Sequence, residues 1–268
     1  MKNAVLTKKL KVGYDEHIVV PEFDAEFIKG KVTSIIGPNG CGKSTVLKAI
    51  GRILRKSDGA IFINDKDISN LKSKDIAKEL SILPQSPSAP GSVTCYELVA
   101  YGRFPYQKGF GKLSEEDKNI ISWALEVTNM SEFANREIGS LSGGQRQRVW
   151  ISMALAQQTD IIFLDEPTTY LDLNYQLEIL ELLKKLNEEH GVTIVMVLHD
   201  LNLASKYSDY LIAMKDGEIV KFGTPNEVIC NEILETCFSI DADIEVLKSG
   251  KPVCFNYELL RMNKNEKE

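Results

Sequence analysis

Short runs of apolar residues alternate with polar ones through the first part of the chain and predict β-strands joined by turns. Residues 3–36 follow this pattern, and the β-branched runs at 18–20 and 32–36 mark the clearest strands. A glycine-rich break comes next, and apolar residues then recur at helical spacing over residues 43–53. The pattern therefore predicts a strand, a glycine loop and a helix in succession.

Farther along the chain, short apolar runs typical of strands alternate with segments whose apolar residues recur at helical spacing. Strands are expected at residues 61–63, 81–85, 161–164, 192–198, 211–214 and 218–222. Helices are expected at residues 94–101, 114–128, 145–157 and 172–190. The second helix begins at Ser114 and acidic residues follow it, which is typical of a helix N-terminus. Strands that alternate with helices imply a parallel core sheet.

These patterns indicate an α/β fold in four parts. The parts are an N-terminal β subdomain with the first part of the core (1–85), an α-helical subdomain (86–140), the second part of the core (141–223) and a short C-terminal tail (224–268). In the tail, residues 250–253 are expected to form a hairpin-like turn, and the charged residues 263–268 to fray.

Composition narrows the class of protein. The chain has 268 residues, with 32 Lys and Arg against 38 Asp and Glu, so its formal net charge is −6. An acidic balance argues against nucleic acid as a partner, because neutralising phosphates needs a basic face. No apolar run approaches the roughly 18 residues of a membrane span, and the first ten residues do not resemble a secretory signal. We therefore expect a cytoplasmic protein that does not itself cross a membrane.

The glycine break carries a motif for phosphate binding. It fits G-x-x-x-x-G-K-[ST] at every required position with Gly37, Pro38, Asn39, Gly40, Cys41, Gly42, Lys43 and Ser44. The glycines let backbone N–H groups turn around a phosphate, and the helix N-terminus adds partial positive charge. We expect Lys43 to neutralise phosphate oxygens and Ser44 to ligate Mg²⁺. Thr45, the next residue, completes the predicted nucleotide-binding segment.

Two carboxylates supply the second half of such a site. They are Asp165 and Glu166, and they directly follow the apolar strand at residues 161–164. Asp165 is expected to hold Mg²⁺ directly or through water, and Glu166 to polarise the attacking water as a general base.

The segment Leu141-Ser142-Gly143-Gly144-Gln145 decides among the families that share these two motifs. It ends 20 residues before Asp165, opens a helix, and resembles the signature of ATP-binding-cassette (ABC) ATPases. Other residues that this family uses stand in the family's order, namely Tyr14, Gln85, Asp172 and His199. The resemblance covers roughly residues 3–223.

The resemblance implies a P-loop NTPase with a RecA-like parallel-sheet core, an N-terminal antiparallel β subdomain and an α-helical insertion. It implies ATP and Mg²⁺ as ligands and two cassettes that pair head to tail as a homodimer. Each ATP would then lie between the phosphate loop of one copy and Ser142, Gly143, Gly144 and Gln145 of the other.

The resemblance also assigns roles to single residues. Tyr14 would stack on adenine, and Asp172 would tie the two copies together across their interface. His199 would contact the γ-phosphate and fix the attacking water. Gln85 would bind Mg²⁺ and water and link the nucleotide to the helical subdomain.

Local resemblance indicates an importer subtype. The stretch at residues 93–106, which contains Gly102-Arg103-Phe104-Pro105, is similar to ATPases of ferric-siderophore, haem and cobalamin importers, as are residues 168–172 and 199–209. This implies an ATP-hydrolysing subunit at the cytoplasmic face of the membrane, working with two permease subunits and indirectly with a substrate-binding protein. Iron(III)-siderophore is the favoured cargo, with haem, cobalamin, zinc or manganese as alternatives. A soluble cassette that assists iron–sulfur cluster assembly is an alternative of another class.

Two further expectations concern single side chains. The helical subdomain should dock the permease through exposed aromatic residues such as Phe104, Tyr106 and Phe110; the alternative is that these side chains only pack the subdomain. The five cysteines are scattered and form no Cys-x-x-Cys pair, so we expect free thiols. Cys41 is either a tolerated loop residue or, because it stands at a helix N-terminus, a thiol with a lowered pKa. The second hypothesis predicts that alkylation blocks nucleotide binding, with ATP protecting.

Overall fold

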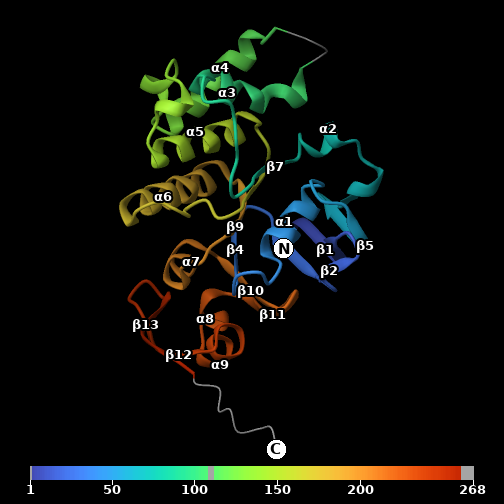
Figure 1. Ribbon diagram of the computed structural model, residues 1–268, viewed down its shortest axis with the longest axis vertical. Helices are drawn as coiled ribbons and strands as arrows, with labels where there is room; N and C mark the ends of the chain where they lie inside the picture. The colour runs from blue at the N-terminus through green and yellow to red at the C-terminus, as the bar shows by residue number, and fades with distance from the viewer. Residues whose placement is uncertain (1, 108–111, 261–268) are drawn as a thin grey trace, which may run out of the picture.

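A six-stranded sheet runs through the centre of the molecule in the order β11-β10-β4-β9-β8-β7 (Figure 1). The computed structural model describes residues 2–107 and 112–260. The strands of this sheet are β4 (Val32–Ile36), β7 (Leu80–Leu83), β8 (Ile161–Leu164), β9 (Thr193–Val197), β10 (Tyr210–Lys215) and β11 (Glu218–Gly223). All neighbours from β10 to β7 are parallel, and only β11 is antiparallel. The expected parallel core sheet is confirmed.

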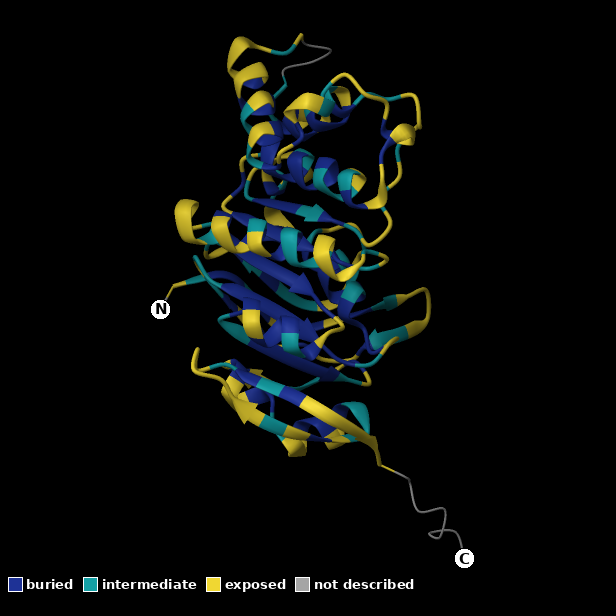
Figure 2. Ribbon diagram, turned by 90° about the vertical axis from the view of Figure 1, so that its left-hand side faces the viewer, coloured by how far each residue is buried: buried dark blue, intermediate teal, exposed yellow. Residues whose placement is uncertain are grey.

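Every residue of β4, β8 and β9 is buried, because layers cover both faces of the sheet (Figure 2). Alternate residues enter two separate apolar clusters: Ile162 faces one, and Phe163 faces the other. The first cluster contains residues of the helices α5 (Gly143–Ala156), α6 (Leu173–His190) and α7 (Leu201–Tyr207). The second contains residues of α1 (Lys43–Ile50) and of a smaller antiparallel sheet.

The smaller sheet is the predicted N-terminal β subdomain. Its strands are β1 (Asn3–Tyr14), β2 (His17–Val20), β3 (Ala25–Ile28), β5 (Lys56–Ile63) and β6 (Lys66–Asp67), all paired antiparallel. The Phe27 and Phe163 rings lie 5.6 Å apart and join the two sheets. The antiparallel subdomain therefore shares its core with the phosphate-loop helix, whose predicted end at residue 53 is wrong: α1 ends at Ile50, and Gly51 follows as its C-cap.

The helical subdomain lies at the end of the molecule away from the C-terminal hairpin (Figure 1). It holds α3 (Cys95–Ala100), the 3₁₀ turns η2 (Tyr101–Tyr106), η3 (Ser131–Phe133) and η4 (Ile138–Ser140), and α4 (Glu115–Val127). The predicted start of α4 is confirmed: Ser114 Oγ accepts from the Asp117 N–H at 3.1 Å, and Asp117 Oδ2 accepts from the Ser114 N–H at 3.0 Å. Short helical turns η1 (Ile68–Asn70) and α2 (Ser73–Ile76) precede β7.

The segment Arg103-Phe104-Pro105-Tyr106 divides into structural and exposed side chains. Arg103 is buried; its Nε donates to Asp117 Oδ1 at 2.7 Å and its Nη1 to the Ala156 carbonyl at 2.8 Å. Tyr106 lies under the Arg103 guanidinium and donates to the Gln157 carbonyl at 2.9 Å. The expectation that Tyr106 is exposed is wrong, because it holds η2 to α5. Phe104 is 72% exposed, and Phe110 lies outside the described residues.

The chain after β11 folds back on the core. It forms α8 (Pro225–Val228), α9 (Asn231–Ile233), a π-helical turn η5 (Leu234–Phe238) and a hairpin of β12 (Ile240–Val246) and β13 (Pro252–Leu259). The predicted hairpin is confirmed, but its turn comes earlier than expected, since the Gly250 N–H donates to the Leu247 carbonyl and Pro252 already begins β13. Residues 263–268 lie outside the described part of the chain.

No helix within residues 2–107 and 112–260 combines the length and apolar character that a membrane span requires.

We predict that Arg103→Met lowers the free energy of unfolding by about 3 kcal/mol, because it leaves the buried Asp117 carboxylate without its cationic partner. Phe104→Ser is the matched control and should change stability by less than about 0.5 kcal/mol, because its side chain is exposed. Urea unfolding measures both variants. Equal stability of Arg103→Met and the parent chain would contradict the structural role of this ion pair.

Candidate nucleotide site

The phosphate loop joins β4 to α1, and the β1–β2 hairpin packs against it. Gly42, the residue before α1, has φ of +101°, a backbone conformation that side chains rarely allow. A Cβ at Gly42 would also come within 2.7 Å of Val20 on β2. The β1–β2 hairpin therefore lies directly against the loop, and glycine is required at this point.

Lys43 is buried and bound to its own loop. Its ammonium group donates to the carbonyl oxygens of Gly37 and Pro38, each at 2.8 Å. These carbonyls hold the positive charge at the mouth of a cavity of about 130 Å³, whose other lining residues include Asn39, Thr45 and Glu166. A phosphate in this cavity would give the Lys43 ammonium group charged oxygen acceptors in place of the neutral carbonyl oxygens. Hydrogen bonds to charged acceptors are the stronger ones.

Asp165 meets the loop from β8 and is 3% exposed. Its Oδ1 accepts from the Ser44 hydroxyl at 2.7 Å, while its Oδ2 is buried without a hydrogen-bond partner among the described residues. Burial raises the pKa of Asp165, and the hydrogen bond from Ser44 and the charge of Lys48 only partly offset this. A buried carboxylate oxygen that lacks a partner, next to a hydroxyl, is the oxygen-donor set that Mg²⁺ prefers. The residues present therefore fit the predicted metal.

Glu166 lies at the centre of a converging set of side chains. Gln85 Nε2 donates to its Oε2 at 2.6 Å, the Thr169 hydroxyl donates to the same oxygen at 2.9 Å, and His199 Nε2 lies 2.8 Å from Oε1. Its backbone has φ of +53°, which is uncommon for a residue with a side chain and occurs often at functional sites. Thr169 was not a predicted partner, and its position three residues after Glu166 in a tight turn is the signal that could have found it.

These hydrogen bonds favour the ionised form of Glu166. Burial alone would raise its pKa, but the bonds from His199, Thr169 and Gln85 outweigh burial, so the pKa of Glu166 lies below its ordinary value. The carboxylate is therefore ionised at neutral pH and able to accept a proton.

The signature segment takes no part in this cluster within one chain. Ser142 caps α5: its Oγ accepts from the Gln145 N–H at 3.3 Å, and Gln145 Oε1 accepts from the Ser142 N–H at 3.1 Å. Ser142 and Gly143 are exposed, and none of residues 142–145 lines the cavity at the phosphate loop. Gly144 is buried beneath the Tyr175 ring, where a Cβ would come within 2.8 Å of that ring.

Asp172 and Tyr14 also stand apart from the cluster. Asp172 is exposed and caps α6, its Oδ1 accepting from the Tyr175 N–H at 3.1 Å. Tyr14 ends β1, opposite His17 in the hairpin that packs on the loop, and is 44% exposed. A single chain thus brings Lys43, Ser44, Asp165, Glu166, Gln85 and His199 to one place. It leaves Ser142 and Gly143 of the signature segment, and also Asp172 and Tyr14, exposed away from that place.

The sequence model of the ABC transporter family matches residues 21–169, more than half of the chain. This chain belongs to the ABC transporter family. An iron(3+)-hydroxamate import ATP-binding protein of Bacillus subtilis (strain 168) is 55% identical to this cassette over 267 residues, covering 99% of the cassette and 98% of that protein. A petrobactin import ATP-binding protein of Bacillus anthracis is 46% identical over 255 residues, covering 95% and 93%.

Solved structures agree with the family. A transporter described as of the metal-chelate ABC type, in an inward-facing conformation, matches with a TM-score of 0.81 and 28% identity, covering 95% of this cassette and 98% of that chain. A bacterial ABC transporter cassette solved as a dimer matches with a TM-score of 0.73 and 32% identity, covering 82% and 98%. The cassette is therefore an ATP-binding ATPase with the predicted fold.

The hypothesis of a lowered thiol pKa at Cys41 is wrong. Cys41 is buried, and its carbonyl accepts from the Gly217 N–H at 3.1 Å at the turn after β10. Burial raises the pKa of the thiol, and the nearby Lys43 charge lowers it by less. Helix position alone did not reveal this, since the residues that cover Cys41 lie far away in sequence. Rapid alkylation of Cys41 is no longer expected.

We predict that Asp165→Asn raises the melting temperature of the nucleotide-free cassette by a few degrees, because it removes a buried charge with an unpartnered oxygen. The same variant should lose the further rise in melting temperature that ATP with Mg²⁺ gives the parent chain. Thermal unfolding with and without ligand measures both effects. A destabilised nucleotide-free variant that still responds fully to Mg²⁺ and ATP would contradict both roles of Asp165.

Proposed function

We propose that this cassette is the ATP-hydrolysing subunit that energises an iron(III)-siderophore importer. The observation that carries the proposal is the 55% identity, across 99% of the chain, to a protein named for iron(3+)-hydroxamate import. The petrobactin import protein supports the same class of cargo. The cassette itself would not contact the cargo, so the cargo is assigned from this likeness rather than from the site.

In the nucleotide site, Ser44, Asp165 and Gln85 would hold Mg²⁺, which supplies positive charge to the phosphates when it is bound. The backbone N–H groups of Gly40 and Gly42 and the ammonium group of Lys43 bind phosphate oxygens. Thr45 extends this segment, and Tyr14 stacks on the adenine. The wholly buried strands beneath the loop keep these groups fixed in direction before ATP arrives.

Glu166 acts as the general base. Its ionised carboxylate takes a proton from water as the water oxygen bonds to the γ-phosphorus, and ADP leaves with the electrons of the broken P–O bond. Within the chain both carboxylate oxygens already accept hydrogen bonds. At least one of them must be released to water, and His199 is the suitable residue because it can turn its Nε2 to the γ-phosphate.

Two copies of the cassette are needed for a complete site. The exposed N-terminus of α5, with Ser142 and Gly143, offers a hydroxyl, backbone N–H groups and partial positive charge to a phosphate, yet lies outside its own chain's cavity. A head-to-tail homodimer places it over the partner's ATP, with Gln145 and the capping residue Asp172 at the same interface. The dimer seen for a related cassette supports such pairing.

The helical subdomain is the surface that docks two permease subunits, and the cassette is peripheral at the cytoplasmic face of the membrane. Phe104 is compatible with this, because its large apolar side chain is 72% exposed and can contact a partner. Gln85 precedes this subdomain and contacts Glu166, so it links the state of the nucleotide to the permease. A substrate-binding protein takes part only through the permease. We assign residues 1–85 and 141–223 to the ATPase core, 86–140 to docking and 224–268 to the tail.

Growth tests the proposal. We predict that a strain lacking this gene fails to grow with ferric hydroxamate as its only iron source, and that the parent gene restores growth. Glu166→Gln should not restore it, although the purified variant still binds ATP, because proton transfer from water is lost. Phe104→Ser should keep its ATP binding and its stability but restore growth poorly.

Normal growth of the deletion strain on ferric hydroxamate would contradict the assigned cargo. Loss of growth on haem alone would point to a haem importer instead, and loss of iron–sulfur enzyme activity on every iron source would point to the different class of cassette.

A further inference from the structure

A cavity of about 430 Å³ lies where the C-terminal hairpin meets α6 and α7, away from the nucleotide site. Its volume is within the range of small-molecule sites, about 300–1,000 Å³. Its walls combine apolar side chains, such as Leu203, Leu247 and Val253, with three lysines. A cavity of mixed apolar and cationic lining has no role in the nucleotide chemistry described above.

The three lysines come from three different elements. Lys184 belongs to α6, Lys206 to α7 and Lys251 to the hairpin turn. Among the described residues that line this cavity, none is acidic. The acidic partners of two of the lysines lie outside the lining: Glu188 is 3.8 Å from Lys184, and Glu181 is 3.7 Å from Lys206.

Both ion pairs are largely exposed and therefore weak. The lining itself is therefore cationic, and its acidic neighbours lie outside it.

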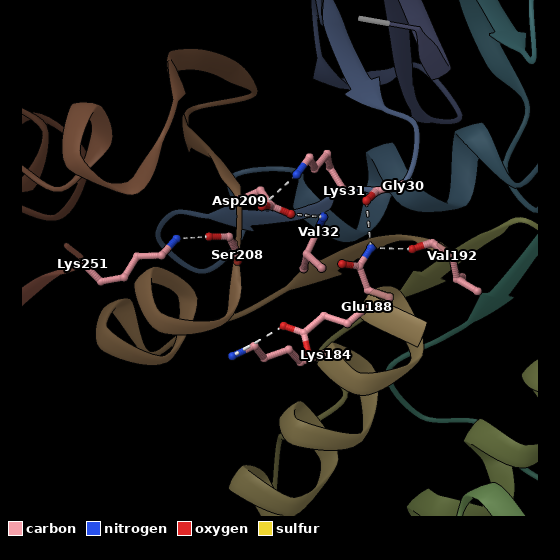
Figure 3. A network of polar contacts seen from close by, with 10 residues as sticks. Gly30, Lys31, Val32, Lys184, Glu188, Val192, Ser208, Asp209 and Lys251 are labelled. Atoms are coloured by element: carbon pink, nitrogen blue, oxygen red, sulfur yellow. Dashed lines mark hydrogen bonds and ion pairs between the residues drawn. The ribbon is translucent and has the colours of Figure 1, made fainter. Parts of the chain in front are cut away.

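Lys251 is the best placed of these amines to gain from an anion. It crosses from the hairpin to the core, where its Nζ donates to the Ser208 carbonyl at 2.5 Å (Figure 3). Burial lowers its pKa, the charge of Asp209 raises it, and the nearby charge of Lys184 lowers it again. An anion between Lys184 and Lys251 would relieve this repulsion.

The cavity is held in shape by hydrogen bonds between the hairpin and α7. Asn202 donates to the Cys254 carbonyl at 2.9 Å and accepts from the Cys254 N–H at 2.8 Å, and Ser205 donates to the Pro252 carbonyl at 2.7 Å. On the hairpin side, all three of these groups belong to the backbone, so the attachment of the hairpin to α7 does not depend on the hairpin's side-chain rotamers. The site is therefore built before any ligand arrives.

One wall of the cavity is connected to the catalytic cluster through the first turn of α7. Leu203 lines the cavity, and its N–H is capped by Asp200 at 2.8 Å at the start of α7. The residue before Asp200 is His199, which contacts Glu166. A ligand that shifts the first turn of α7 would therefore change how His199 meets Glu166.

We propose that this cavity binds an amphipathic organic anion, and that its occupancy changes ATP hydrolysis through α7 and His199. The anionic group lies between Lys184 and Lys251, and the apolar part lies against Leu203, Leu247 and Val253. A free alkyl carboxylate and an anionic lipid share this chemistry. The proposal goes beyond iron import and holds for the ATPase whatever the cargo is.

Calorimetry with octanoate tests the site on the full chain without nucleotide. We expect saturable binding of one octanoate per chain and no binding of octylammonium, which has the same alkyl length and the opposite charge. Lys184→Gln should bind octanoate about tenfold more weakly, as expected for the loss of one charged hydrogen bond. This variant leaves the hydrogen bond from Lys251 to the Ser208 carbonyl intact, so the hairpin stays attached to the core.

Lys185→Gln is the matched control. Lys185 is the next residue on α6 and pairs with Glu189 at 3.9 Å, much as Lys184 pairs with Glu188, but it does not line the cavity. It should bind octanoate as the parent chain does. Saturating octanoate should change the ATPase rate of the parent chain and of Lys185→Gln, while at the same concentration Lys184→Gln responds less.

Three results would overturn the proposal: equal octanoate affinity in all variants, equal affinity for octylammonium, or an ATPase rate that saturating octanoate leaves unmoved. Sedimentation with vesicles of phosphatidylcholine, with and without phosphatidylglycerol, separates the two sources of ligand. Binding to the anionic vesicles that depends on Lys184 identifies a lipid, and octanoate binding without vesicle binding identifies a free anion.

Discussion

The parallel register of four neighbouring strands is the constraint on which the nucleotide site depends. Strands β4, β9, β8 and β7 run in the same direction, so their carboxyl ends meet at one edge of the sheet. The phosphate loop follows β4, the two carboxylates follow β8, His199 follows β9 by two residues, and Gln85 follows β7 by two residues. The hydrogen bond from Ser44 to Asp165 and the contacts of Glu166 then form between segments that are up to 121 residues apart in sequence.

This register explains why much of the site could be predicted from the sequence. The apolar runs of β8 and β9 are followed at once or within two residues by Asp165 and His199, so one stretch of sequence predicts both the strand and the side chain at its end. The apolar run of β4 is followed by the glycine loop that leads to Lys43. The helix start at Ser114 was predictable for a similar reason, since a cap and its partner lie three residues apart.

What the sequence could not provide depends on packing between distant segments. The backbone of Cys41 is hydrogen-bonded to Gly217, Gly144 lies under Tyr175, and Tyr106 donates to the Gln157 carbonyl. A helix position predicted a reactive thiol and an aromatic residue predicted an exposed contact, yet burial from elsewhere in the chain reversed both. The unpartnered oxygen of Asp165 is likewise a property of the assembled core.

Under the proposed function, one chain supplies only part of each complete ATP site. Glu166 is ionised, but both of its oxygens already accept hydrogen bonds, and the capped N-terminus of α5 is exposed. In the proposed head-to-tail dimer, a γ-phosphate would bind at the helix N-terminus of one copy and would draw His199 of the other copy away from Glu166. Under the same proposals, Gln85 would connect this change to the helical subdomain, and α7 would connect it to the C-terminal hairpin.

The most direct test of this account mixes two inactive variants. Lys43→Ala removes the lysine of the phosphate loop, and Ser142→Arg blocks the signature helix, so each variant alone should hydrolyse almost no ATP. In a mixed dimer, the intact loop of one chain faces the intact signature of the other. The account predicts that ATPase activity returns on mixing the two folded proteins, and a mixture as inactive as its parts would contradict it.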